Sequence, residues 1–261
     1  MKFILSLGVI VFLFASITET RAQKPQLYKD MSRAERLVFV NEQVRRLGRA
    51  MSGNDYEITN DFAEDIRKAV TLYAERIGSE KSNLLPVLER AQINAPLLIS
   101  TFKARNVSPL IGLYIPWIES EYQNIQPADS KAAVGVYQIM PATGLTFGLT
   151  PQDLLDVGKS ADAAALYIRN TLETFKDDPM KEALSLLAYN RGVGQTSRDL
   201  EFMLGDQKTL CSICVLTADH SKLDETFKYE SVFYVPRFFA AAIIGENPTV
   251  FGIQMQPLSA H

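Results

Sequence analysis

Residues 109–141 read PLIGLYIPWIESEYQNIQPADSKAAVGVYQIMP, and this stretch places a carboxylate at the end of an apolar segment. Ser108 and Pro109 form a typical helix start, because serine caps the first turn and proline at the first helical position loses no hydrogen bond. The nine residues that follow are apolar on every face of such a helix, which indicates that the helix is buried. Pro116 predicts a kink or a break, since an interior proline removes a backbone hydrogen bond at a cost of about 3 kcal/mol. The stretch therefore predicts a buried core helix that ends at Glu119.

Glu119 is the first charged residue after this apolar run. Burial and the negative end of the helix dipole both disfavour a carboxylate there, so both raise its expected pKa. A glutamic acid with a raised pKa can donate a proton at neutral pH, as a general acid must. Glu121 follows two positions later, about 200° around a regular helix, and is expected to face away from the site. The alternative is that Glu119 is a surface residue just beyond a core helix.

Two later segments have the composition of a ligand-binding wall. Residues 132–141 (AAVGVYQIMP) combine small residues, a glycine and an uncharged glutamine, and small side chains allow a ligand to approach the backbone closely. Residues 184–190 (LSLLAYN) read as a helix that ends before Gly192 and Gly194, because glycine is a common helix stop. Each segment alone is a weak signal, and their order along the chain carries more information.

Three motifs follow one another in that order: Glu119-Ser120, AVGVYQIMPATG at residues 133–144, and AYN at residues 188–190. Together they resemble the signature of the lytic murein transglycosylases of the soluble-lytic-transglycosylase, goose-lysozyme-like type. Residues 229–253 (YESVFYVPRFFAAAIIGENPTVFGI) are similar to the tail of the membrane-bound lytic transglycosylase D subgroup, here without its LysM repeats. Tyr137 stands where the family more often has Met or Trp, which keeps an aromatic or apolar wall.

The resemblance implies an all-α, lysozyme-like helical domain that cleaves the β-1,4 bond between N-acetylmuramic acid and N-acetylglucosamine in peptidoglycan. It implies that Glu119 first protonates the glycosidic oxygen and then accepts the proton of the C6 hydroxyl of the muramoyl residue, which leaves a 1,6-anhydro-muramoyl end. It also implies that neither a metal nor a cofactor is needed. The residues expected to bind the substrate are Ser120, which would orient the carboxyl group, Ser130, Gln138, Tyr189, Asn190 and Tyr234.

Three other functions stay open. A goose-type muramidase would cleave the same bond with water and would need a second acidic residue, for which Asp129 and Asp153 are the candidates. A catalytically silent peptidoglycan-binding protein of the envelope would keep the groove without the chemistry. A helical partner-binding protein would leave Glu119 unexplained. Tyr189 and Asn190 also have a plain alternative as a core aromatic residue and a helix C-cap.

Composition argues against several other classes of protein. The two histidines, His220 and His261, offer little for a Ser-His-Asp or Cys-His site, and no metalloprotease, phosphate-loop or dinucleotide-binding motif occurs. A net charge of −3 without a basic cluster argues against nucleic acid as a partner. Cys211 and Cys214 form a C-x-x-C pair, which favours a local disulfide in an exported protein. Free thiols, a redox pair or a metal site are the alternatives.

The chain divides into four expected segments. Residues 1–22 read as a signal peptide, so we expect an exported, periplasmic protein, with an uncleaved membrane anchor as the alternative. Residues 23–90 are expected to form an N-terminal helical extension, 91–202 the catalytic core, and 203–261 a C-terminal helical segment that completes the core. The amphipathic pattern of the extension favours packing against the core, and an envelope-protein partner is the alternative. No long alternating strand occurs, so at most a short ribbon is expected near residues 125–140.

Overall fold

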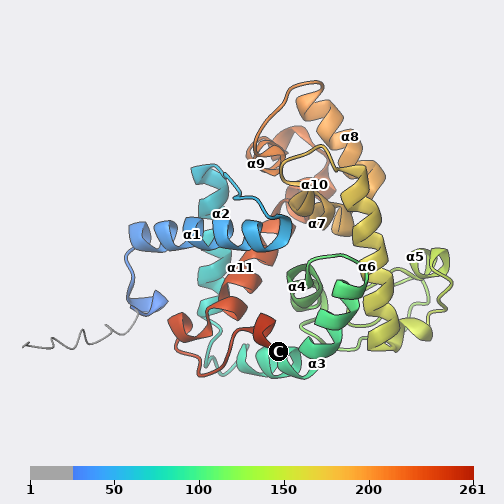
Figure 1. Cartoon of the computed structure of the whole chain (residues 1–261), viewed down its shortest axis with the longest axis horizontal. Coiled ribbons are helices and arrows are strands. Elements are labelled where there is room, and N and C mark those ends of the chain that lie inside the picture. The colour runs from blue at the N-terminus through green and yellow to red at the C-terminus, as the bar shows by residue number, and fades with distance from the viewer. Residues whose placement is uncertain (1–25) are drawn as a thin grey trace, which may run out of the picture.

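The computed structural model describes residues 26–261, and the prediction of an all-α fold is confirmed there (Figure 1). Within that range no β-strand forms, and the ribbon expected near residues 125–140 is reduced to an antiparallel bridge between Val134 and Ile139. The signal peptide expected at residues 1–22 lies outside the described residues. The α-helices are α1 (Arg33–Ser52), α2 (Asn60–Ala74), α3 (Leu85–Ala104), α4 (Pro109–Ser120), α5 (Pro141–Thr146), α6 (Val157–Thr174), α7 (Lys181–Arg191), α8 (Val193–Leu204), α9 (Ser212–Ala218), α10 (Glu225–Tyr229) and α11 (Tyr234–Glu246). The short 3₁₀ segments are η1 (Tyr28–Asp30), η2 (Asp153–Leu155), η3 (His220–Lys222), η4 (Ser231–Phe233), η5 (Pro248–Phe251) and η6 (Leu258–Ala260).

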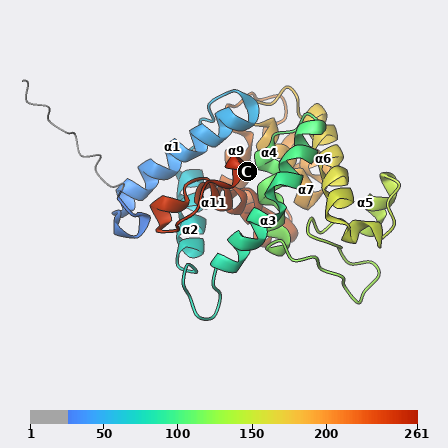
Figure 2. The same cartoon turned by 60° about the horizontal axis from the view of Figure 1, so that its bottom comes forward.

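Helix α4 is the central helix of the fold, as its composition predicts. Ten of its twelve residues are buried, because α1, α3, α6 and α11 all pack against it (Figures 1 and 2). Gly112 allows the closest of these approaches, since a Cβ atom there would lie only 2.4 Å from the Phe102 ring of α3. A helix that is apolar on every face is thereby covered on every face.

Pro116 lies inside α4, but the helix continues to Ser120 without the break that the sequence allowed. Because proline has no N–H, the carbonyl of Gly112, one turn earlier, has no partner within the helix. The Tyr137 hydroxyl donates a hydrogen bond to that carbonyl at 2.8 Å, so the buried acceptor is satisfied. Tyr137 is fully buried and is therefore a core residue that fastens the following loop to α4, not an exposed wall of a ligand groove.

The N-terminal helices belong to the same hydrophobic core as the rest of the described chain. Helix α2 packs along α11, and α1 contacts both of them (Figure 2). The expected boundary between residues 90 and 91 falls inside α3, and that between residues 202 and 203 falls inside α8. Neither boundary therefore coincides with a break in the structure.

The connection between α4 and α5 is held in place by a backbone hydrogen bond within it and by a side-chain hydrogen bond to η2. The N–H of Gly135 donates to the carbonyl of Ile125 at 2.8 Å, and the side-chain amide of Asn124 donates to the carbonyl of Leu155 at 2.7 Å. Gly135 has a φ of +77°, and a Cβ atom at this position would lie 2.2 Å from the Leu154 carbonyl oxygen. Only glycine meets both conditions without strain, so this residue fixes the path of the loop.

Cys211 and Cys214 are joined by a disulfide at the start of α9, and the Cys214 sulfur accepts a hydrogen bond from the N–H of Thr59, just before α2. Across the part of the chain that the structure describes, no helix combines the length and the apolar character needed to cross a membrane.

Candidate active site

Glu119 lies in the last turn of α4, and its carboxyl group meets the start of α11. The Tyr234 hydroxyl donates a hydrogen bond to Oε1 of Glu119 at 2.6 Å. Tyr234 is only 5 % exposed, so its hydroxyl is held in place by the surrounding core. This contact joins residues 115 positions apart in the sequence, and it places Tyr234 on the carboxyl group itself.

The environment of Glu119 makes this residue a proton donor near neutral pH. Burial raises the pKa of the Glu119 carboxyl from 4.5 to about 7, although the hydrogen bond from Tyr234 and the positive charge of Arg237 both oppose the rise. A carboxylic acid with a pKa near the working pH is present in both protonation states. It can therefore give a proton to an ether oxygen and take one back in the same catalytic cycle.

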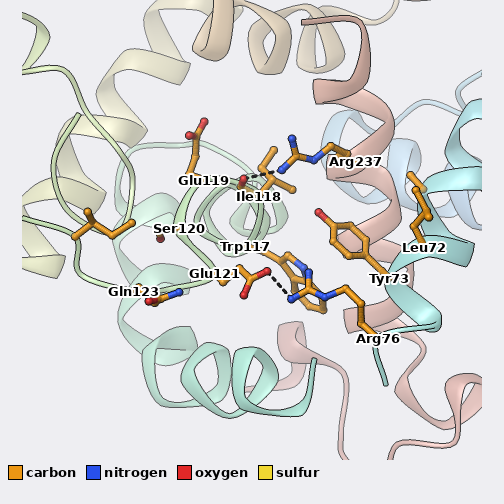
Figure 3. Close-up of a pocket in the computed structure, with 12 residues that line it drawn as sticks. Leu72, Tyr73, Arg76, Trp117, Ile118, Glu119, Ser120, Glu121, Gln123 and Arg237 are labelled. Carbon is orange, nitrogen blue, oxygen red and sulfur yellow. Dashed lines mark hydrogen bonds and ion pairs between the residues drawn. The ribbon is translucent and has the colours of Figure 1, made fainter. Parts of the chain in front are cut away.

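A pocket of about 390 Å³ opens beside Glu119. Figure 3 shows Leu72, Tyr73 and Arg76 from α2 and the turn after it on one side, the end of α4 near the centre, and Arg237 of α11 beside it. Apolar and aromatic side chains form part of the lining, and the guanidinium groups of Arg76 and Arg237 belong to another part. The lining residues are Ala69, Leu72, Tyr73, Arg76, Trp117, Ile118, Glu119, Ser120, Glu121, Gln123, Ile125 and Arg237.

Glu121 lines the same pocket, contrary to the expectation that it faces away from the site. The expectation assumed a regular helix, but α4 ends at Ser120 and Glu121 adopts a left-handed backbone conformation with a φ of 51°. Its carboxylate accepts a hydrogen bond from the Arg76 guanidinium at 2.6 Å, and Figure 3 shows it pointing in a different direction from that of Glu119. The two carboxyl groups of the pocket therefore have different partners. Glu121 is paired with the Arg76 cation, and Glu119 accepts a hydrogen bond from the Tyr234 hydroxyl.

Tyr189 and Asn190 lie at the end of α7. The Tyr189 hydroxyl donates to the carbonyl of Tyr137 at 2.8 Å. Burial raises the pKa of Tyr189, and the Glu119 charge adds to the rise. Asn190 is exposed, and its Oδ1 accepts a hydrogen bond from the Ser231 hydroxyl at 2.8 Å.

Both residues line a second pocket, of about 200 Å³. This pocket also includes Tyr167, whose ring packs edge-on against that of Tyr189 at 5.6 Å between centroids. The exposed Met140 forms part of its rim. Tyr189 and Asn190 therefore line a pocket whose lining does not include Glu119.

Ser120 and Ser130, two further predicted residues, form no hydrogen bond to Glu119 among the residues that the structure describes. Ser120 is buried, and its hydroxyl donates to the carbonyl of Val136 at 2.7 Å. This bond holds the loop to α4, and the role of Ser120 in orienting Glu119 stays a prediction. Ser130 is exposed in the turn that precedes this loop, and no hydrogen bond joins it to the other predicted residues that the structure describes.

Gln138 is half-buried at the bend of the loop, with a left-handed φ of 48°. Its amide Nε2 donates to the carbonyl of Gly135 at 2.7 Å. This internal bond uses one of the two amide protons, and the carbonyl oxygen and the second proton are left for a ligand.

Neither of the acidic residues considered for a hydrolytic mechanism lines the Glu119 pocket. Asp129 accepts a hydrogen bond from the N–H of Lys131 at 2.9 Å, as in an ordinary turn. Asp153 bonds to Lys159 and Thr150, and the Lys159 ammonium holds the pKa of Asp153 well below its usual range. Residues 26–261 also contain no cluster of three or more side chains suited to hold a metal ion.

Sequence reasoning missed three residues of the Glu119 pocket: Tyr73, Arg76 and Arg237. Tyr73 and Arg76 lie in and just after α2, a segment whose pattern indicates only an amphipathic helix. Arg237 could have been predicted from the sequence, because it lies three positions after Tyr234 and so on the same face of α11.

Comparison with known proteins agrees with this geometry. Residues 97–203 match the family model of the transglycosylase SLT domain, so this part of the chain is similar to that domain and has its lysozyme-like helical fold. The matched region contains Glu119, Gln138, Tyr189 and Asn190, whereas Tyr234 and Arg237 lie beyond its end. No curated protein matches the chain. The family supports an enzyme of peptidoglycan turnover, with the glycan strand as its substrate.

Proposed function

We propose that this protein cleaves the β-1,4 bond between N-acetylmuramic acid and N-acetylglucosamine and leaves a 1,6-anhydro-muramoyl end. The observation that carries the proposal is the state of Glu119, a partly buried carboxyl group with a pKa of about 7 and a hydroxyl donor at 2.6 Å. The residues outside the matched domain, 204–261, supply that donor through α11. On this basis we place the chain near the membrane-bound lytic transglycosylase D subgroup.

The reaction needs one acid that later serves as a base. The protonated Glu119 gives its proton to the glycosidic oxygen, and the bond between that oxygen and C1 of the muramoyl residue breaks. The Glu119 carboxylate then takes the proton of the C6 hydroxyl while the C6 oxygen bonds to C1. Water is neither consumed nor released, and Glu119 ends the cycle protonated.

The arrangement of carboxylates favours this reaction over hydrolysis. Most glycosidases use two carboxylates across the bond, but the second carboxylate of the Glu119 pocket belongs to Glu121 and is paired with Arg76. Asp129 and Asp153 are engaged in turns away from the pocket. Intramolecular attack by the C6 hydroxyl requires no such second residue. Tyr189, Asn190 and Gln138 are assigned to binding the two sugars.

Zymography in a peptidoglycan gel separates an enzyme from a binding protein. The wild-type chain is expected to clear the gel, and Glu119→Gln is expected to lose the clearing while it still binds the peptidoglycan. Glu121→Gln is the matched control, because it makes the same change in the same pocket and is expected to retain cleavage. Clearing by Glu119→Gln would contradict the assignment of the acid.

The location follows from the substrate, which lies in the cell envelope. We propose that residues 1–22 direct export to the periplasm and are removed. N-terminal sequencing of the protein recovered from the periplasm tests this, with a start at Gln23 as the expected result. A protein that keeps residues 1–22 would favour an uncleaved anchor. A partner for residues 23–90 stays a separate proposal, since the core contacts of α1 and α2 explain only their buried faces.

A further inference from the structure

We propose that Arg237 binds a carboxylate of the peptide stem carried by the muramoyl residue, so that the pocket beside Glu119 selects peptide-bearing glycan. This inference deepens the proposed function, and it rests on that function for the identity of the substrate. It concerns a residue on α11 that lies beyond the matched SLT domain.

The first argument is the state of the Arg237 side chain. Arg237 is exposed, and its Nη2 donates to the carbonyl of Ile118 at 3.1 Å. This bond holds the guanidinium next to Glu119, as Figure 3 shows. A guanidinium has five N–H donors, so the others are available. Among residues 26–261, no carboxylate forms an ion pair with Arg237.

The second argument is the charge of the pocket. Arg76 is neutralised by Glu121 at 2.6 Å, and its Nε donates to the carbonyl of Ser82 at 3.0 Å. When Glu119 is protonated, Arg237 therefore leaves the pocket with an excess positive charge. A planar guanidinium in this state suits a carboxylate, which it can bind through two parallel hydrogen bonds.

The third argument is the shape and lining of the pocket. Leu72, Tyr73 and Ile125 give it an apolar and aromatic wall, and Leu72 and Ile125 are exposed on that wall. A neutral sugar offers no charge to Arg237, whereas a peptide stem offers both aliphatic side chains and carboxylates. The stem is attached to the muramoyl residue whose bond is cleaved, so a pocket that begins at Glu119 lies within its reach.

Binding of soluble muropeptides to Glu119→Gln tests the inference without turnover. Three probes are compared: a disaccharide with a tetrapeptide, the same compound with its carboxylates converted to amides, and the disaccharide without peptide whose lactyl carboxyl group is also converted to an amide. The acidic muropeptide is expected to bind about tenfold more tightly than the other two, as a charge-assisted hydrogen bond at a partly exposed site allows. The preference is expected to shrink with added salt, because an exposed ion pair is screened.

Two further substitutions in the Glu119→Gln background test whether Arg237 is responsible for the preference. Arg237→Gln is expected to abolish the preference, and Arg237→Lys is expected to keep part of it. Arg169→Gln is the matched control, since it removes the same charge from an exposed position of α6 outside the pocket, and it is expected to keep the full preference. Thermal melts verify that each variant is folded.

Equal binding of the three probes, or an undiminished preference in Arg237→Gln, would overturn the inference. Failure of the proposed function has a different signature, because it would be seen as the absence of anhydro-muramoyl products from the wild-type enzyme. The binding preference does not depend on that result.

Discussion

Replacing Glu119 with glutamine should stabilise the folded protein above neutral pH. The folded-state pKa of about 7 lies above the ordinary value of 4.5, so the folded chain binds the Glu119 proton more tightly than the unfolded chain does. Stability from this group is complete below pH 4.5 and is lost as the pH rises to 7 and above. At about 1.4 kcal/mol for each pH unit, the loss amounts to about 3 kcal/mol. Glutamine does not titrate, and its amide oxygen can still accept the Tyr234 hydrogen bond.

The assay is thermal or urea unfolding of wild type and Glu119→Gln at pH 5 and at pH 8. From pH 5 to pH 8, the free energy of unfolding of the variant is expected to rise by up to about 3 kcal/mol relative to that of wild type. This corresponds to a relative rise in melting temperature of about 6 to 12 °C for a chain of this size. Glu89→Gln, at an exposed position of α3, serves as the control and should show no such gain. A difference between wild type and Glu119→Gln that does not change with pH would refute the reasoning from burial.

Three other outcomes follow from the same contacts. Tyr234→Phe removes the donor that lowers the pKa of Glu119, so the alkaline limb of the pH dependence of kcat/KM should move to higher pH; an unmoved limb would contradict the role of this bond. Gly135→Ala should destabilise the protein by about 2 kcal/mol or more in urea unfolding, since the new Cβ would lie 2.2 Å from the Leu154 carbonyl oxygen; wild-type stability would show that the loop can shift. Reduction of the disulfide at the start of α9 should cost about 2 kcal/mol of stability and leave peptidoglycan cleavage nearly unchanged, and a large loss of activity would assign α9 a part in shaping the site.

The features predicted best from the sequence are those that depend on one continuous segment. The apolar run of α4 predicts both its burial and the raised pKa of Glu119, because a helix end inside a core desolvates whatever charge it carries. The disulfide also forms between near neighbours in sequence. In each case the physical cause and the residues lie within a few positions of one another.

The features that sequence reasoning missed depend on contacts between distant segments. The bond of the Ser120 hydroxyl to the loop was not foreseen, because its acceptor is a carbonyl sixteen positions away. Pro116 does not break α4 because the freed carbonyl finds a tyrosine twenty-five positions further on. The pocket arginines come from α11 and from the end of α2, and no local pattern shows that these elements meet at Glu119.

Mass spectrometry of peptidoglycan digested by the purified protein tests the central claim most directly, with Glu119→Gln digested in parallel. We expect muropeptides with 1,6-anhydro-muramoyl ends from the wild-type protein and none from the variant. Products heavier by one water, with reducing muramoyl ends, would contradict the intramolecular reaction and indicate a hydrolase. The anhydro products from both proteins alike would contradict the role of Glu119.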